Sequence, residues 1–195
     1  MKTIYPGQTI GIIGGGQLGR MMALAAKEAG FKVAVLEPKM DSPCGQIADI
    51  QIVAPYNDEA ALEELAEVSE VITYEFENID YEGLKRLTEI AYVPQGAELV
   101  KITQDRILEK RSIRAAGVPV AKFIEVQSFE ELSSNIDNIG YPCVVKTTRG
   151  GYDGKGQQIV KSKEELQLAK PLFQHSPCIA EAFVPFTKEI SVIVQ

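Results

Sequence analysis

Residues 141–160 read YPCVVKTTRGGYDGKGQQIV and contain the most informative pattern in the chain. Two apolar runs, residues 143–147 and 157–160, are typical of β-strands. The loop between them has four glycines among the seven residues from Gly150 to Gly156. Such a loop is too long for a tight hairpin turn, and glycine leaves its backbone amides open to an anion. The pattern predicts a glycine-rich cover over an anionic ligand.

Cationic side chains surround this loop. Lys146 leaves the first strand, and Arg149 and Lys155 lie near the two ends of the glycine run. Ammonium and guanidinium groups beside open amides suit a polyphosphate, because both kinds of group hydrogen-bond phosphate oxygens. The loop is not a P-loop, since GxxxxGK[ST] is absent and the loop joins two strands. A mobile exposed hairpin without a ligand is the alternative.

The sequence around the loop predicts several further elements. In chain order these are a connector at 93–101, a helix at 105–116 that stops at Gly117, an edge strand at 123–126, and short helices that start at Ser128-x-x-Glu131 and Ser162-x-x-Glu165. Residues 188–195 alternate between apolar and polar side chains, which predicts a strand. Because a chain that ended within a buried strand would leave an apolar edge, we expect a longer enzyme that continues beyond residue 195.

The first hundred residues alternate between β-branched runs and segments rich in helix formers. The predicted strands are residues 9–14, 32–37, 50–54 and 71–74, and the predicted helices are 17–30, 58–68 and 82–87. Asn57 or Asp58 can cap the second helix. Asp80 can cap the third, with Ile79 and Leu84 as a hydrophobic staple. Alternating strands and helices predict a parallel sheet covered by helices on both faces.

The turn after the first strand, Gly14 to Gly19, reads GGGQLG and satisfies the GxGxxG pattern. Glu37 ends the second strand, where a dinucleotide-binding fold places the acid that binds a ribose. The glycines allow close backbone approach, and the amides at the start of the following helix form an anion site. Three interpretations stay open on this pattern alone: a nicotinamide or flavin cofactor, a phosphate-bearing substrate that is not a dinucleotide, and a tight turn without a ligand.

A second candidate site follows the fourth strand, where residues 73–78 read TYEFEN. Open α/β folds bind ligands at the carboxyl edge of the parallel sheet, and this strand end carries Glu75, Glu77 and Asn78. The two glutamates are two residues apart, so an extended backbone directs both to the same side. The alternative is a solvated acidic loop.

Composition limits the class of protein. The 195 residues include 20 Lys and Arg against 27 Asp and Glu, with a formal net charge of -7, and 45% of them are hydrophobic. This excludes an intrinsically disordered chain, and the acidic balance argues against a nucleic-acid partner. Cys44, Cys143 and Cys178 have no CxxC spacing, so we expect reduced thiols, and we expect the single histidine, His175, at the surface. Without a signal peptide or a long apolar run, we expect no membrane association and a cytoplasmic location.

Five motifs occur in a fixed order. They are GQLGRM (16–21), TYEFEN (73–78), QDR (104–106), VVKT (144–147) and GGYDGKGQ (150–157). Together they resemble the 5-(carboxyamino)imidazole ribonucleotide synthases, ATP-grasp enzymes of purine biosynthesis; the related formate-dependent glycinamide ribonucleotide transformylase is the alternative. The resemblance implies an α/β fold, with a Rossmann-like parallel-sheet preATP-grasp domain followed by the first part of an ATP-grasp domain. The implied boundaries are 1–100 for the substrate-binding domain, 101–185 for a linker helix and the first ATP-grasp subdomain, and 186–195 for the start of the second.

The resemblance also implies a function and its residues. The family joins bicarbonate to the exocyclic amine of aminoimidazole ribonucleotide at the expense of ATP, through carboxyphosphate. The implied ATP-binding residues are Arg106, Lys146, Gly151, Tyr152, Asp153, Gly154, Lys155, Gly156, Gln157, Glu181, Ala182, Phe183, Val184 and Glu189. The implied substrate-binding residues are Gly16, Gln17, Leu18, Glu75 and Asp153. The glycine turn is thereby reassigned from a dinucleotide to a ribonucleotide.

Each group has an implied task. Arg106 and Lys146 resemble the cations that hold ATP phosphates, and the loop 151–157 closes over them. Residues 181–184 resemble the hinge that reads the adenine edge, and Glu189 resembles the acid that holds the ribose hydroxyls. Phosphoryl transfer depends on positioning and charge neutralisation, which these residue types supply.

The resemblance implies a cofactor and an assembly as well. In this family the Mg2+ ligands lie on later strands, so we expect no metal ligand in this chain, and residues 1–195 alone are predicted to be inactive. The family also implies a homodimer. A non-catalytic nucleotide-binding module is the alternative.

Overall fold

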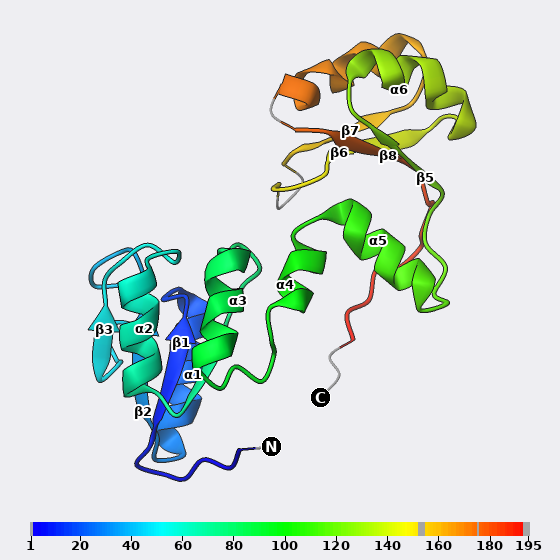
Figure 1. Ribbon diagram of the computed structural model, residues 1–195. Helices are drawn as coiled ribbons and strands as arrows, with labels where there is room; N and C mark the ends of the chain where they lie inside the picture. The colour runs from blue at the N-terminus through cyan, green and yellow to red at the C-terminus, as the bar shows by residue number, and fades with distance from the viewer. Residues whose placement is uncertain (1, 152–154, 175, 193–195) are drawn as a thin grey trace. The chain divides into compact units, whose positions relative to one another are not determined.

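The computed structural model describes residues 2–151, 155–174 and 176–192. The chain divides into two compact units, Met1–Thr103 and Gln104–Gln195. Each unit combines a four-stranded sheet with helices, as Figure 1 shows, so the predicted α/β class is confirmed. No helix in the described ranges is long and apolar enough to cross a membrane.

The first unit is built on a parallel sheet with the strand order β3-β2-β1-β4. Its strands are β1 (Thr9–Ile13), β2 (Lys32–Leu36), β3 (Ile50–Ile52) and β4 (Val71–Tyr74), and its helices are α1 (Gln17–Glu28), α2 (Glu59–Val68), α3 (Tyr81–Ile90) and α4 (Glu98–Thr103). This order places β1 between β2 and β4. The segments that follow these three strands therefore meet at one edge of the sheet.

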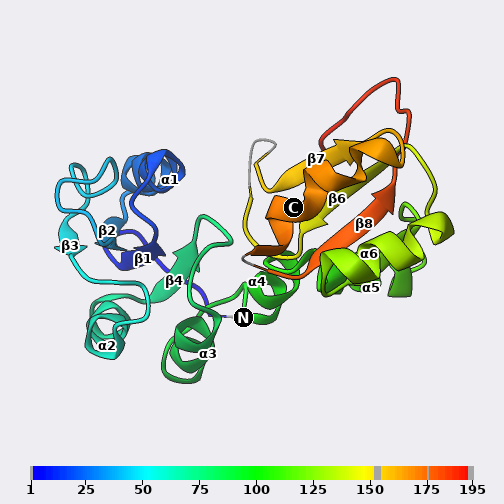
Figure 2. The same cartoon turned by 90° about the horizontal axis from the view of Figure 1, so that it is seen from above.

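Both faces of this sheet are buried, because successive side chains along a strand point to opposite faces. On β1, Ile13 joins the core formed with α2 and α3, whereas Ile12 joins the core that contains Ala23 of α1. Figure 2 shows α1 on one face of the sheet and α2 with α3 on the other. Leu65 and Leu87 are almost completely buried, and each such side chain contributes roughly 1.5–3 kcal/mol to stability. The predicted cover on both faces is confirmed.

Polar caps fix the starts of two helices in this unit. Asp58 and Asp80 each accept a hydrogen bond from a backbone amide in the first turn of α2 and α3, as predicted. Ile79 and Leu84, the predicted staple, are buried in the same core. The connector predicted at 93–101 is wrong in part, because α4 begins at Glu98 within it. No Ser, Thr, Asp or Asn precedes α4 to announce it, and burial of an apolar side chain, that of Val100, stabilises it instead.

The second unit has an antiparallel sheet with the strand order β5-β8-β6-β7. Its strands are β5 (Phe123–Val126), β6 (Cys143–Thr147), β7 (Gln157–Val160) and β8 (Cys178–Ala182), and its helices are α5 (Arg106–Ala115), α6 (Phe129–Asn135) and the 3-10 segments η1 (Ile136–Asn138) and η2 (Glu164–Gln174). The predicted edge position of β5 is confirmed, and β6 and β7 flank the glycine-rich loop as predicted.

The two faces of this second sheet have different partners. One face packs against α6 and η2, and α5 lies on the other side (Figure 1). Val145 of β6 and Ala180 of β8 point into the core under α6 and η2. Lys146, Ile179 and Glu181 alternate with them and therefore point toward the α5 side. Charged side chains thus lie on the face that α6 and η2 leave uncovered.

The predicted final strand differs from the structure. Residues 188–192 have no regular secondary structure, and 193–195 lie outside the described residues. Ile190 and Val192 are 81% and 76% exposed. An alternating pattern forms a strand only where a neighbouring strand accepts its hydrogen bonds, and within the described ranges none pairs with this segment.

The helix predicted at Ser162 is a 3-10 helix, η2, that begins two residues later. The carboxylate of Glu165 accepts a hydrogen bond from the amide of Lys161, the residue before the predicted cap. The Ser162 hydroxyl donates to the Glu164 carboxylate, so the predicted capping box does not form.

Candidate functional site

A buried carboxylate between two ammonium groups forms the centre of the site in the second unit. Glu181 of β8 has a side chain that is only 7% exposed. Its Oε2 accepts a hydrogen bond from Lys146 Nζ at 3.1 Å, and its Oε1 lies 3.2 Å from Lys110 Nζ. The antiparallel register of β6 and β8 pairs Val144 with Glu181, which places Lys146 and Glu181 on one face of the sheet. Lys110 reaches them from α5.

One oxygen of this carboxylate lacks a hydrogen bond among the described residues. Lys110 Nζ is close enough to Glu181 Oε1 for an ion pair but is not aligned to donate to it. The ion pair with Lys110 compensates the charge of this buried oxygen. The cluster of Lys110, Lys146 and Glu181 therefore places two cationic groups around one buried carboxylate on a single face of the sheet.

A guanidinium group holds the base of the glycine-rich loop. Arg106, the first residue of α5, donates hydrogen bonds to the carbonyl oxygens of Thr147 at 2.8 Å, Gly150 at 2.6 Å and Gly151 at 2.9 Å. The preceding residue, Asp105, caps α5 with its carboxylate. The Oδ2 atom of this carboxylate also lies 3.2 Å from Arg149 Nε. The start of α5 and the loop are thus fastened together by charge-assisted hydrogen bonds.

The two ends of the loop are drawn together at its base. The Thr147 amide donates to the Gly156 carbonyl at 2.9 Å, and Gln157 pairs with Lys146 in the β6–β7 ladder. Gly151 has a φ of +77°, and a Cβ there would lie 2.5 Å from the Lys155 carbonyl oxygen, so only glycine fits. The predicted site residues Tyr152, Asp153 and Gly154, and also His175, lie outside the described residues.

The predicted adenine-reading segment begins in β8 and continues beyond it. Glu181 and Ala182 end the strand, and Phe183 donates its amide hydrogen to the Pro142 carbonyl. The side chains of Phe183 and Val184 are 39% and 51% exposed, so an apolar surface follows directly after the buried carboxylate. Glu189 is exposed in an irregular segment. In the part of the chain that the structure describes, it makes no hydrogen bond to the lysine cluster.

In the first unit, the predicted substrate residues meet at the carboxyl edge of the parallel sheet. Gly16 precedes α1, whose first residues are Gln17 and Leu18. The Gly16 amide donates a hydrogen bond to Glu75 Oε1, 3.2 Å away, from the end of β4. A Cβ at Gly14 would lie 2.5 Å from Glu75 Cγ, so the glycines let this carboxylate approach the turn. The structure thus brings Gly16, Gln17, Leu18 and Glu75 together.

Glu37 occupies the same turn from the end of β2. Glu37 is buried, with 8% of its surface exposed. Its Oε2 accepts hydrogen bonds from the Gly15 amide at 2.8 Å and the Tyr56 hydroxyl at 2.5 Å. Oε1 accepts from the Lys39 amide. In the dinucleotide interpretation this acid would bind a ribose, but here it is engaged within the turn itself.

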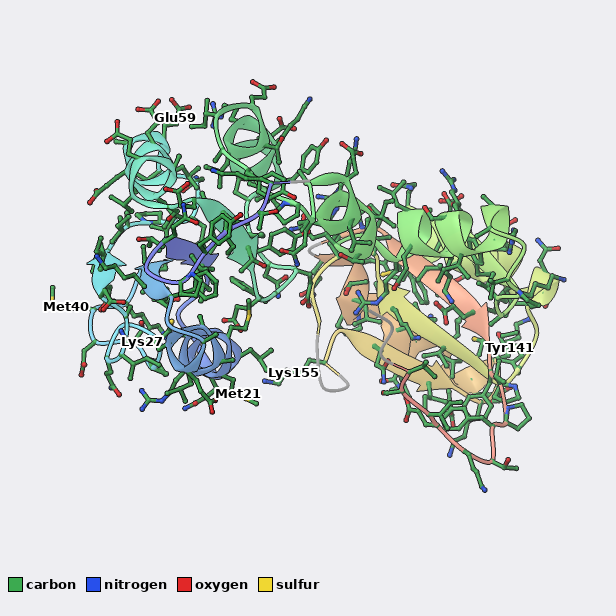
Figure 3. The ribbon with its side chains drawn as sticks, turned by 90° about the horizontal axis from the view of Figure 1, so that it is seen from below. Met21, Lys27, Met40, Glu59, Tyr141 and Lys155 are labelled. Carbon is green, nitrogen blue, oxygen red and sulfur yellow. The ribbon has the colours of Figure 1, made fainter. Side chains whose placement is uncertain are left out.

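Sequence reasoning missed Lys110 and Tyr56. Lys110 is four residues after Arg106, and this spacing places both on one face of α5, which could have indicated a second cation for the same ligand. Tyr56 follows β3 in a turn, and no local pattern links it to Glu37. Met21, the last residue of the GQLGRM motif, lies on the outer side of α1 and is 65% exposed (Figure 3).

The described residues offer no metal site of the usual kind. They contain no group of three or more His, Cys, Asp or Glu side chains placed to hold a metal ion. The three cysteines are free and buried, and burial raises the pKa of the Cys44 and Cys178 thiols to about 11. Glutamates at the turn, Glu75 and Glu37, add to the shift at Cys44.

Two family models match the chain, one after the other. Residues 7–104 match the ribonucleotide synthetase preATP-grasp domain, and residues 111–195 match the ATP-grasp domain. The chain therefore belongs to the family of ribonucleotide synthetases with a preATP-grasp domain. Over 193 residues it is 54% identical to the N5-carboxyaminoimidazole ribonucleotide synthase of Bacillus subtilis, a match that covers 99% of this chain and 51% of the relative. It thus spans about half the length of the curated relatives it matches.

Solved structures of the same name are similar in fold. A crystal structure of an N5-carboxyaminoimidazole ribonucleotide synthetase with ADP has 56% sequence identity and a TM-score of 0.91, and covers 94% of this chain and 49% of that one. The Aspergillus clavatus enzyme, in complex with ADP and 5-aminoimidazole ribonucleotide, has 26% identity and a TM-score of 0.84, with coverage of 94% and 48%.

Proposed function

We propose that this chain is part of an ATP-dependent carbon–nitrogen ligase that carboxylates aminoimidazole ribonucleotide with bicarbonate in purine biosynthesis. The products are 5-(carboxyamino)imidazole ribonucleotide, ADP and phosphate. The family and the relatives that carry this name support the proposal. A solved relative holds both ADP and the ribonucleotide, which agrees with two separate binding regions.

The observation that carries the proposal is the cluster of Lys110, Lys146 and Glu181 beside the glycine-rich loop. Two ammonium groups can neutralise phosphate oxygens, and the open amides of the loop can hydrogen-bond them. Glu181 pairs with both ammonium groups and holds them in place, and it begins the segment 181–184 that resembles the hinge that reads the adenine edge. The combination suits a purine nucleoside triphosphate.

The chemistry has two steps. A bicarbonate oxygen attacks the γ-phosphorus of ATP and ADP leaves, which gives carboxyphosphate. The amine of the ribonucleotide then attacks the carboxyl carbon, the C–O bond to phosphate breaks, and the amine loses a proton. Lys146 and Lys110 neutralise charge in the first step, and Arg106 holds the loop that limits access of water. Gly16, Gln17, Leu18 and Glu75 hold the ribose of the second substrate.

Further parts of the proposal rest on the resemblance. Among the described residues no group of three or more His, Cys, Asp or Glu side chains is placed to hold a metal ion, and Glu181 is already held by two ammonium groups. We therefore assign the Mg2+ that accompanies ATP to ligands beyond residue 195, and we expect residues 1–195 alone to bind ATP weakly without turnover. Bicarbonate as the carboxyl donor, a homodimeric enzyme and a cytoplasmic location complete the proposal, and the free cysteines agree with a reducing compartment.

The deciding experiment measures ADP formation by the full-length protein. We expect strong stimulation only when aminoimidazole ribonucleotide and bicarbonate are both present. The Lys146→Met variant should lose this activity, whereas Lys122→Met, the same change at an exposed residue, should keep it.

Three outcomes would contradict parts of the proposal. Stimulation by formate and glycinamide ribonucleotide instead would assign the chain to the transformylase. ATP binding without any stimulated turnover would make it a non-catalytic nucleotide-binding module. Turnover by residues 1–195 alone would refute the assignment of the metal ligands to later residues.

A further inference from the structure

The first three amides of the glycine turn in the first unit, those of Gly14, Gly15 and Gly16, already have acceptors. The Gly14 amide donates to the Leu36 carbonyl at 3.0 Å. The Gly15 amide donates to Glu37 Oε2 at 2.8 Å, and the Gly16 amide to Glu75 Oε1 at 3.2 Å. In a dinucleotide-binding turn, amides at this position hold a phosphate. Here two carboxylates take that place.

The contact between Glu37 and the turn leaves no room for another group. A Cβ on Gly15 would lie 2.6 Å from Glu37 Cγ and 2.5 Å from Ser42 Oγ. Ser42 is itself 4% exposed and accepts a hydrogen bond from the Gly45 amide. A phosphate could reach the Gly15 amide only by displacing a buried carboxylate, and the like charges would repel each other.

Tyr56 fixes this carboxylate and links it to the second one. Its hydroxyl donates to Glu37 Oε2 at 2.5 Å, and burial raises the pKa of Tyr56, so the hydroxyl remains a donor. Its ring packs edge-on against Phe76, with the centroids 5.3 Å apart. Phe76 is the residue after Glu75, so Tyr56 connects the acid at the end of β2 with the acid at the end of β4.

We propose that Glu37, held by Tyr56, is a positioning and specificity-determining residue that closes the Gly15 part of the glycine turn to phosphate and leaves the turn to bind uncharged ribose hydroxyls beside Glu75. For its substrate, a ribonucleotide, the inference rests on the proposed function. Glu37 acts in two ways: its charge excludes anions from the turn, and its hydrogen bonds set the backbone of Gly15 and Gly16. The two effects can be separated by substitution. A neutral side chain at residue 37 removes the exclusion of anions, whereas loss of the Tyr56 hydroxyl weakens only the positioning of the Gly15 and Gly16 backbone.

The test compares Glu37→Gln and Tyr56→Phe in the full-length enzyme, with Glu64→Gln and Tyr5→Phe as matched exposed controls. For Glu37→Gln we expect inorganic phosphate to inhibit about fivefold more strongly against aminoimidazole ribonucleotide, with the KM for that substrate raised and the KM for ATP unchanged. For Tyr56→Phe we expect the KM for the ribonucleotide to rise about threefold without added sensitivity to phosphate. Glu37→Asp, which keeps the charge, should remain insensitive to phosphate.

A second measurement does not depend on the enzyme's substrate. In protein labelled with 15N-glycine, inorganic phosphate should shift the Gly15 amide resonance of Glu37→Gln and leave that of the wild type unchanged. If the enzyme does not use aminoimidazole ribonucleotide but this shift occurs, the proposed function fails and the inference holds. If Glu37→Gln folds and is no more sensitive to phosphate than the wild type in either measurement, the inference is overturned. If Glu37→Gln does not fold, an unchanged ribonucleotide KM in Tyr56→Phe overturns it.

Discussion

Lys146 and Glu181 are 35 residues apart in sequence, yet a 3.1 Å hydrogen bond joins their side chains across two neighbouring antiparallel strands. Lys110 completes the arrangement from α5. Because Glu181 is buried and both of its cations are partly so, the three charges depend on one another. Removal of one would leave the others poorly compensated.

Glu181→Ala should therefore destabilise the protein. It would leave two ammonium groups side by side without a counter-charge, and we expect a loss of about 2–3 kcal/mol in the free energy of unfolding. We expect a smaller loss of stability than for a fully buried ion pair, because the Lys146 side chain is 27% exposed. Urea denaturation followed by circular dichroism measures it. The exposed Glu130→Ala should change stability by less than about 0.5 kcal/mol, and equal losses in the two variants would contradict the argument.

Lys110→Met should weaken ATP binding. If the Lys110 ammonium contacts phosphate as well as Glu181, we expect affinity to fall about tenfold, the effect of one lost charge-assisted hydrogen bond. Isothermal titration of the full-length protein with ATP measures this, with Lys122→Met as the exposed control. Unchanged affinity together with lowered stability would mean that Lys110 serves only to compensate Glu181.

Arg106→Lys should loosen the base of the glycine-rich loop. Lysine keeps the charge but cannot donate to three carbonyl oxygens in the geometry of a guanidinium group. We expect the Thr147 amide, which is bonded to the Gly156 carbonyl, to exchange about tenfold faster, measured by hydrogen exchange. Arg114→Lys on the same helix, where the guanidinium lies over the Phe123 ring, is the control. Equal exchange in both variants would show that Arg106 does not fasten the loop.

The buried thiols should be unreactive at neutral pH. Burial raises the pKa of Cys44 and Cys178 to about 11, so at pH 8 only about one thiol in a thousand is a thiolate. Iodoacetamide should label them only in denaturing urea. Since an unfolded thiol ionises near 9.0 and the folded ones near 11, the unfolded chain releases protons first. The contribution of the thiols to stability should be constant below pH 9 and should fall from pH 9 to 11; a rise of stability over that range would contradict the assignment.

Local patterns were enough to predict much of the fold. Strands β4, β6 and β7 have the predicted bounds, because apolar runs next to glycine-rich or polar loops are local signals. The strand predicted at residues 188–195 was wrong for 188–192, because an alternating pattern specifies a strand only when a partner strand is present. The fold of the first unit followed from the alternation of strands and helices.

The site was predicted less completely than the fold. Lys146 was identified from the VVKT motif and Glu181 from the resemblance to the hinge, but their contact depends on the strand order. The contact of Lys110 depends on the packing of α5 against the sheet. Likewise, the motif at Gly14 to Gly19 predicted an anion site. Only the structure reveals that the carboxylates of Glu37 and Glu75 accept from the Gly15 and Gly16 amides.

The position of β8 has a consequence for how the second unit folds. β8 inserts between β5 and β6, although both of these strands precede it along the chain. During synthesis the hairpin of β6 and β7 can form early from local contacts, but the sheet stays in two pieces until β8 has emerged. The strand that brings Glu181 is thus the one that closes the sheet. We therefore expect formation of the Lys110, Lys146 and Glu181 cluster and closure of the four-stranded sheet to be a single late event in folding.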